Sequence, residues 1–207
     1  ENESILIDCG EGTQRQMKIM KLKPSKITKI LITHWHGDHV LGLGGLLRTL
    51  GSNDYSNELQ IYGPAGSKKY FKNLMNSCIF NEKVKVKITE LKKSVFFEND
   101  KYKLECIPLK HSTHCLGYSF IEKDKRKINL EYTKKFNLVQ DPLLGQLQKG
   151  KDIIYEGKKI KAKDATYLVK GKKISFLIDT TECKECIQLA KDSDLLISES
   201  TFSIKEK

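Results

Sequence analysis

The sequence predicts an α/β fold in which sheets and helices pack in layers as a sandwich, with metal-binding loops at the strand ends. Three observations predict it. Strand-like and helix-like segments alternate over the first 80 residues, short alternating strands follow from residue 84, and histidine or aspartate comes directly after several apolar runs. With 207 residues, 39% of them apolar and 30% charged, the chain is long enough to bury one sizeable core.

The first part of the chain alternates strands with helices. Residues 4–10, SILIDCG, form an apolar, β-branched run that ends in glycine and therefore predicts a buried strand. Residues 11–22 are good helix formers that stop before Pro24. The same reasoning predicts strands at 26–34 and 59–64 and helices at 39–50 and 65–80.

Short strands dominate the rest of the core. Apolar and polar residues alternate with a period of two, which predicts half-buried strands, at 84–91, 94–99, 102–111 and 116–123. A strand, a helix and a strand follow at 173–181, 182–192 and 195–200.

Residues 123–172 have a different composition. They hold many lysines, few large apolar residues and no clear periodicity apart from one short helix-like run at 130–138. We therefore expect a core made of residues 1–122 and 173–207, with 123–172 inserted as an excursion that projects from it.

The segment THWHGDH holds three of the chain's five histidines directly after an apolar run. His34 and His36 lie two apart at a strand end, so their side chains share one face. Asp38 and His39 follow Gly37, which permits a tight turn. Imidazoles and a carboxylate suit Zn²⁺ or a similar divalent ion, and the alternating directions of these side chains would serve two ions.

Three residues elsewhere are candidates for the same site. His111 and His114 lie at the end of one predicted strand and just beyond it, and Asp179 ends another predicted strand, where a carboxylate is out of place unless it points at something. A carboxylate such as Asp179 can bridge two cations. Any one of these residues alone is more simply a solvent-exposed loop residue, but the His-x-His-x-Asp-His pattern after a buried strand favours metal binding.

The net charge, the apolar content and the cysteines limit the classes of protein to which this chain could belong. A net charge of +11 suits an acidic partner such as nucleic acid, although a lysine-rich genome would give the same bias. No apolar stretch reaches the roughly 18 to 20 residues of a membrane span. The six cysteines lie mostly in apolar patterns, which indicates buried free thiols in a cytoplasmic protein, and the lone pair Cys183 and Cys186 is expected to be structural.

Five segments carry a resemblance to a known family. THWHGDH is the signature loop of the metallo-β-lactamase superfamily. Together with DCGEGTQRQ (8–16), PLKHSTHCLGY (108–118), IDTT (178–181) and LLISESTF (195–202), it resembles the ribonuclease Z family, the endonucleases that mature the 3′ end of transfer RNA. The resemblance implies a metallo-β-lactamase αββα sandwich with a protruding flexible arm. It also implies a cleavage that leaves a 3′-hydroxyl on the transfer RNA and a 5′-phosphate on the trailer.

The resemblance implies ligands and a catalytic residue as well. It implies two bound zinc ions. One ion would be held by His34, His36 and His111, and the other by Asp38 and His39. Asp179 would bridge the two ions. Asp38 would also be the proton acceptor. His114 would be a neighbour of the site and not a ligand.

The excursion at 123–172 resembles the arm by which this family grips the elbow of transfer RNA. Residues 141–150 stand at the place of its tip, although Asp141 precedes Pro142 where the family has glycine. Lysines would contact phosphates without reading sequence, at Lys134, Lys135, Lys149, Lys151, Lys158, Lys159, Lys161 and Lys163. The implied partners are precursor transfer RNA and a second subunit, in a homodimer where one arm serves the other subunit's active site.

Two departures from the family pattern affect these expectations. The second zinc of the family needs one further histidine from a C-terminal segment, and the glycine-rich strand that begins the family's fold is not seen before Glu1. We therefore expect a fragment or one half of a split enzyme, in which Glu199 would hold the further histidine. The alternatives are another hydrolase of the superfamily, such as a thioesterase or a DNA-processing nuclease, and a catalytically impaired protein that only binds transfer RNA.

Overall fold

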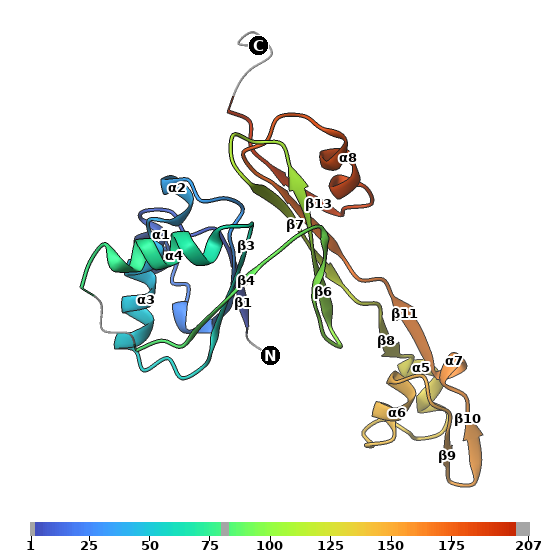
Figure 1. The fold of residues 1–207 in the computed structure, drawn as a ribbon. Coiled ribbons are helices and arrows are strands. Elements are labelled where there is room, and N and C mark those ends of the chain that lie inside the picture. Colours follow the sequence, from blue (N-terminus) through green and yellow to red (C-terminus); the bar gives the residue numbers. More distant parts are fainter. Residues whose placement is uncertain (1–2, 80–82, 202–207) are drawn as a thin grey trace.

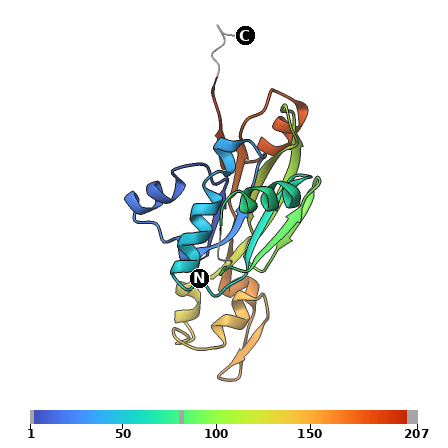
Figure 2. The same cartoon turned by 60° about the vertical axis from the view of Figure 1, so that its left-hand side comes forward.

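Two β-sheets face each other and carry helices on their outer faces (Figure 1). The structure, a computed structural model, describes residues 3–79 and 83–201. A smaller lobe, the arm, projects from one end of this core in both views (Figure 1, Figure 2).

The first sheet is wholly parallel and comes from the amino-terminal part of the chain. Its strands, in spatial order, are β1 (Ser4–Ile7), β2 (Ile27–Leu31), β3 (Leu59–Gly63) and β4 (Val86–Glu90). Crossover connections between parallel strands need intervening segments, here α1 (Thr13–Ile19), the 3-10 helix η1 (Pro24–Lys26), α2 (Gly37–Val40), α3 (Leu43–Ser52) and α4 (Ser67–Asn76). Because all four strands run in one direction, the residues that follow β1 and β2 meet at the same sheet edge.

The second sheet is mostly antiparallel. It has the order β13-β12-β7-β6-β5, formed by β5 (Ser94–Glu98), β6 (Tyr102–Leu109), β7 (Cys115–Glu122), β12 (Lys173–Leu177) and β13 (Leu195–Ser198). Only β12 and β13 pair in parallel, and α8 (Lys184–Ala190) connects them across the outer face (Figure 1).

Apolar side chains fill the three spaces between these layers. Ile30 on β2 and Ile32 just after it pack among the helices, while Leu31 packs against the second sheet, as the period of two along an extended chain requires. Tyr118 is fully buried between the sheets and donates a hydrogen bond to the carbonyl of Ile32, 2.7 Å away. Leu189 packs α8 onto the second sheet.

A polar contact also joins the two sheets. The Glu3 carboxylate accepts hydrogen bonds from Lys29 on β2 at 2.9 Å and from the Tyr102 hydroxyl on β6 at 2.8 Å. Lys29 is 5% exposed, and its ammonium lies 4.2 Å from the centre of the Phe97 ring. Burial alone would raise the pKa of Glu3, but the hydrogen bonds from Lys29, Thr28 and Tyr102 lower it to about 2.

The arm folds around a small core of its own. Its elements are β8 (Lys125–Ile128), α5 (Leu130–Lys134), α6 (Leu144–Gln148), β9 (Ile153–Tyr155), β10 (Lys158–Ile160), α7 (Ala162–Ala165) and β11 (Thr166–Val169). Leu138, Leu147 and Ile160 are fully buried in it. The antiparallel pair β8 and β11 continues the pair β7 and β12, so a two-stranded ribbon leads from the core into the arm.

Three expectations about elements need correction. The helix predicted at 39–50 is two helices, α2 and α3, because the Gly42 N–H donates to the Cys9 carbonyl at 2.9 Å and so leaves the helical hydrogen-bond pattern. A Cβ at Gly42 would collide with the carbonyl oxygen of Gly10. The helix predicted at 65–80 ends at Asn76, and residue 80 lies outside the described residues. The arm, expected to show only one short helix-like run at 130–138, has α5 within that run and further short strands and helices besides.

Among the described helices, none is both long enough and apolar enough to pass through a bilayer.

Candidate metal centre

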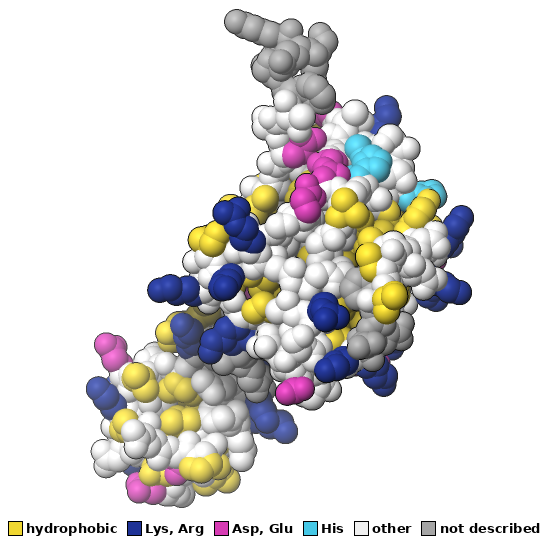
Figure 3. Space-filling view, turned by 90° about the vertical axis from the view of Figure 1, so that its left-hand side faces the viewer, with side chains coloured by type: hydrophobic (Ala, Val, Ile, Leu, Met, Phe, Trp, Pro, Cys, Tyr) yellow, Lys and Arg dark blue, Asp and Glu magenta, His cyan; other side chains and the backbone are white. Residues whose placement is uncertain are grey.

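Loops from both sheets meet at the end of the core away from the arm (Figure 1). Histidine and acidic side chains are exposed near this end (Figure 3). The first sheet contributes the residues that follow β1 and β2, and the second sheet contributes the loops after β6 and β12. The Leu116 backbone N–H donates to the Thr33 carbonyl at 2.9 Å, and the Thr181 N–H donates to the Lys110 carbonyl at 2.9 Å. These bonds tie neighbouring loops together and fix the side chains that they carry.

Three histidines form the first group of donors. The ligand atoms of His34, His36 and His111 all lie within 4.8 Å of one another. The His36 Nδ1 is 3.0 Å from the His34 Nε2 and 3.2 Å from the His111 Nε2. His34 is fully buried at the end of β2, whereas His36 is exposed.

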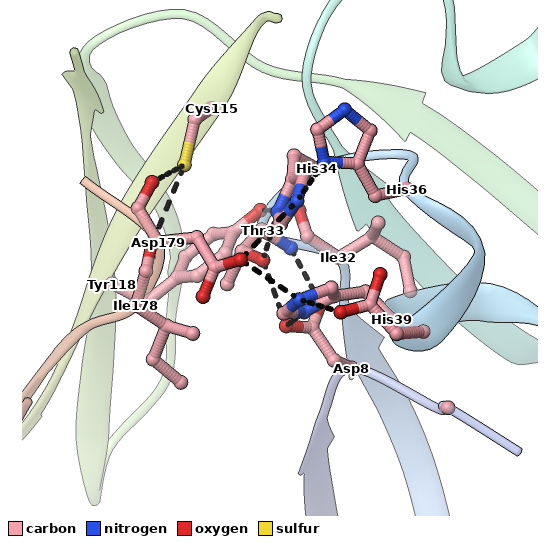
Figure 4. Close-up of polar contacts among 12 residues, drawn as sticks. Asp8, Ile32, Thr33, His34, His36, His39, Cys115, Tyr118, Ile178 and Asp179 are labelled. Carbon is pink, nitrogen blue, oxygen red and sulfur yellow. Dashed lines mark hydrogen bonds and ion pairs between the residues drawn. The ribbon is translucent and has the colours of Figure 1, made fainter. Parts of the chain in front are cut away.

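A second group combines His34 and His39 with Asp179 (Figure 4). The Asp179 Oδ2 lies 3.3 Å from the His39 Nε2 and 3.8 Å from the His34 Nε2. Because His34 belongs to both groups, the Asp179 carboxylate also lies 3.8 Å from a donor of the first group. Imidazole nitrogens and carboxylate oxygens are the donors that zinc and similar divalent ions prefer, so both groups fit a metal ion.

Asp38 lies beside the second group without belonging to it. Its Oδ2 is 3.3 Å from the His39 Nε2, and its side chain is 67% exposed. The backbone of Asp38 lies close against Gly10, in the loop after β1. A Cβ at Gly10 would collide with the Asp38 carbonyl oxygen. A carboxylate in this position faces both the donors and the solvent.

Asp8 is part of the site although the sequence analysis did not select it. Its Oδ2 lies 2.8 Å from the His39 Nδ1, and its two oxygens accept hydrogen bonds from the Thr33 N–H and hydroxyl, each at 2.7 Å (Figure 4). A carboxylate on the remote ring nitrogen orients a histidine ligand and raises its basicity. The argument that selected Asp179, an acidic residue directly after an apolar strand, applies equally to Asp8 and would have found it.

The histidines of the site differ in protonation. Burial, together with the neighbouring His39, His111 and His36, lowers the pKa of His34 to about 4, so its ring is neutral and free to bind a metal. The hydrogen bond to Asp8 raises the pKa of His39 to about 9, against the effect of burial. His39 must therefore release a proton before its Nε2 can bind a cation.

The other selected residues lie outside these groups. His114 is exposed and belongs to neither of the two donor groups found among the described residues. The Glu199 carboxylate accepts hydrogen bonds from the backbone and hydroxyl of Thr201, at 2.9 Å and 2.5 Å. The selected lysines are all exposed on the arm, at Lys134, Lys135, Lys149, Lys151, Lys158, Lys159, Lys161 and Lys163.

Comparison with known proteins places this chain in a family. The family model described as the metallo-beta-lactamase superfamily matches residues 1–124. A protein of Nanoarchaeum equitans named ribonuclease Z is 40% identical to this chain over 205 residues. Another protein of that name, from Prochlorococcus marinus strain MIT 9312, is 36% identical, and the match covers 100% of this chain and 69% of the relative. The chain belongs to the ribonuclease Z family of the metallo-β-lactamase superfamily.

Solved structures support the fold assignment. The crystal structure of human tRNase Z, short form, matches 99% of this chain with a TM-score of 0.66 and 24% sequence identity, and 70% of that chain is covered. Relative to two curated ribonuclease Z proteins, from Nanoarchaeum equitans and a Picosynechococcus strain, the chain spans 65% of their length. The match thus includes both sheets, the donor loops and the arm.

Proposed function

We propose that this chain acts as a metal-dependent endoribonuclease that removes the 3′ trailer from precursor transfer RNA. The products would be a transfer RNA with a 3′-hydroxyl and a trailer with a 5′-phosphate. The observation that carries the proposal is the convergence of the donors of His34, His36, His39, His111 and Asp179 at one end of the core. The relatives named ribonuclease Z support the same activity.

Two zinc ions are the cofactors that this donor set suits best. His34, His36 and His111 would hold one ion, Asp38 and His39 the other, and Asp179 would contact both. A pair of divalent cations supplies an activated water near neutral pH and neutralises charge on a phosphate. Asp8 would keep the His39 Nε2 directed at the site, since it holds the opposite ring nitrogen at 2.8 Å.

Asp38 is the residue best placed to move the proton of the attacking water. Its carboxylate is largely exposed and stands 3.3 Å from the His39 Nε2. A carboxylate that borders both the donors and the solvent can accept a proton from water and pass it on.

The arm would bind the body of the transfer RNA. Residues 123–172 contain fourteen Lys and Arg against six Asp and Glu, and so carry eight of the eleven net positive charges of the chain. Exposed lysines at Lys134, Lys135, Lys149 and Lys151 are available for phosphate contacts, which position a nucleic acid without reading its sequence. Because the arm projects from the end of the core opposite the donors (Figure 1), an arm that serves the partner's site in a homodimer is part of the proposal.

The test is cleavage of a precursor transfer RNA by the zinc-loaded protein, with the ends of both products mapped. We expect cleavage at the trailer junction that leaves a 3′-hydroxyl on the transfer RNA. Chelation of the metal should abolish this cleavage, and added zinc should restore it. Tight binding of the precursor without cleavage would favour a binding-only protein. Hydrolysis of thioesters or DNA in preference to the precursor would favour another hydrolase of the superfamily.

A further inference from the structure

A pair of thiols lies directly behind the donor loops. Cys183 and Cys186 are three residues apart at the start of α8, so that their side chains share one face of its first turn. Their sulfur atoms are 3.3 Å apart, and neither forms a disulfide in the structure. We propose that Cys183 and Cys186 close reversibly to an intramolecular disulfide, and that closure weakens metal binding at His111 and Asp179. The second half of this inference rests on the proposed metal site.

The sulfur atoms of Cys183 and Cys186 need to move only a short way to form a disulfide. A disulfide has a sulfur separation of about 2.05 Å, so the two atoms must approach by a little over 1 Å. Both cysteines are half-buried, and Lys184 between them is exposed, so a small reagent can reach the pair. Cys115, by contrast, is buried, and its thiol is directed at the carbonyls of Ile178 and Asp179.

The two thiols are also unequal in reactivity. Burial would raise the pKa of Cys183, but hydrogen bonds from the Cys186 thiol and backbone N–H and from the backbone of Lys110 hold it below its usual range. The pKa of Cys186 is raised, chiefly by burial. Since the thiolate is the nucleophile, Cys183 is the residue that reacts first.

Closure needs a two-electron acceptor, and a low-molecular-weight disulfide such as oxidised glutathione serves. The Cys183 thiolate attacks one glutathione sulfur, the reagent's S–S bond breaks, and one glutathione thiol leaves. Cys186 then attacks the Cys183 sulfur of the mixed disulfide and expels the second glutathione. The two cysteines lose two electrons and two protons, which end on the two glutathione thiols.

The contacts of Cys186 connect the thiol pair to the donors. Its sulfur lies 3.8 Å from the Thr181 carbonyl and 3.9 Å from the Thr180 hydroxyl. Both threonines donate hydrogen bonds to the Lys110 carbonyl, from the Thr180 hydroxyl at 3.1 Å and the Thr181 N–H at 2.9 Å. Asp179 precedes Thr180 and His111 follows Lys110, so withdrawal of the Cys186 sulfur loosens the link between the two donor loops.

The first experiment detects the disulfide without any metal. The full chain carrying Cys78→Ser, which removes the exposed lone cysteine, is equilibrated with oxidised glutathione, and free thiols are then alkylated and counted by mass spectrometry. The expected product has lost two hydrogen atoms and has two fewer alkylated cysteines, assigned to Cys183 and Cys186 by peptide mapping. Cys186→Ser should instead keep a stable mixed disulfide at Cys183. Absence of the internal disulfide overturns the proposal.

The second experiment measures zinc affinity of reduced and oxidised protein by competition with a chromophoric chelator. Oxidation is expected to weaken binding about tenfold, the usual effect of disturbing groups that support metal ligands, and reductant should restore it. Equal affinity in both states overturns the coupling, whereas failure of the reduced protein to bind zinc refutes the metal site itself. The double variant Cys183→Ser/Cys186→Ser should bind zinc as reduced protein does; loss of one zinc equivalent would show that the thiols hold metal instead.

Discussion

Asp8 and Asp179 hold equivalent positions on the two sheets. Asp8 comes directly after β1 and Asp179 two residues after β12, and both have a positive φ, 54° and 52°. Aspartate enters this left-handed region more easily than most residues, because its short side chain bonds locally. Their carboxylates approach opposite nitrogens of the His39 ring, at 2.8 Å and 3.3 Å, so this histidine is fixed from both sheets.

Replacement of Asp8 by asparagine tests its role in positioning His39. Asparagine tolerates the same φ and keeps an oxygen for the Thr33 N–H, but it removes the charge that orients the ring. We expect zinc affinity to fall about 10- to 100-fold, measured by competition titration. Asp54→Asn is the matched control, since Asp54 also has a positive φ, 51°, and is exposed outside the site. An unchanged affinity in Asp8→Asn would limit Asp8 to supporting the backbone.

Removal of the Asp38 carboxylate tests its role as proton acceptor. For Asp38→Ala we expect kcat on precursor transfer RNA to fall by about 10²- to 10⁴-fold, while the Kd for the precursor stays within about twofold. Bound zinc is counted in the same sample, because Asp38 is also proposed as a ligand. A parallel loss of binding and cleavage would contradict the role assigned to Asp38.

The sequence predicted which residues lie at the site better than it predicted which of their donor atoms lie together. The spacing in THWHGDH selected His34, His36, Asp38 and His39, and the structure places all four at one end of the core. It could not foresee that His34 belongs to both donor groups, because that depends on how loops from two sheets approach each other in space. The ligand roles themselves stay predictions until a metal titration is done.

At the scale of elements, the strands and helices of the core were predictable, whereas most of those of the arm were not. The runs that gave β6 and β7 are each eight residues long, enough for a period of two to show, and the run that gave β2 is a stretch of mainly apolar residues. The elements of the arm are three to five residues long, and apart from the helix-like run that gave α5 they lie in a sequence without clear periodicity. Their core depends on dispersed residues such as Leu138 and Ile160, which meet only after the chain has folded.

Deletion of the arm separates substrate binding from hydrolysis. Lys125 pairs with Val169 at the base of the ribbon, so residues 126–168 can be replaced by a short Gly-Ser turn without stretching the core. The Kd for transfer RNA should rise at least about tenfold, because the proposed phosphate contacts of the arm would be lost. Hydrolysis of a small phosphodiester should persist at the wild-type rate. An unchanged Kd would remove the arm from substrate binding.

For the molecule as a whole, the contact of Glu3 with Lys29 and Tyr102 predicts how stability depends on pH. Because the pKa of Glu3 is lowered to about 2 from 4.5, its contribution is complete above about pH 4.5 and is lost as pH falls towards 2. Glu3→Gln should lower the free energy of unfolding by about 1 to 2 kcal/mol at neutral pH, a value reduced because the Glu3 side chain is 34% exposed. The difference between the two proteins, from urea unfolding at several pH values, should vanish near pH 2. A constant difference would mean that the Glu3 charge is not responsible.

The ribbon that carries the arm has a further consequence for how this chain can change during evolution. The chain enters the arm from β7 and returns from it into β12. These two strands pair with each other at the edge of the arm, where Ile121 lies opposite Lys173. Insertions or deletions within the arm therefore do not shift the pairing of the core sheet or the loops after β6 and β12. The length and charge of the arm can therefore change while the donor residues keep their places.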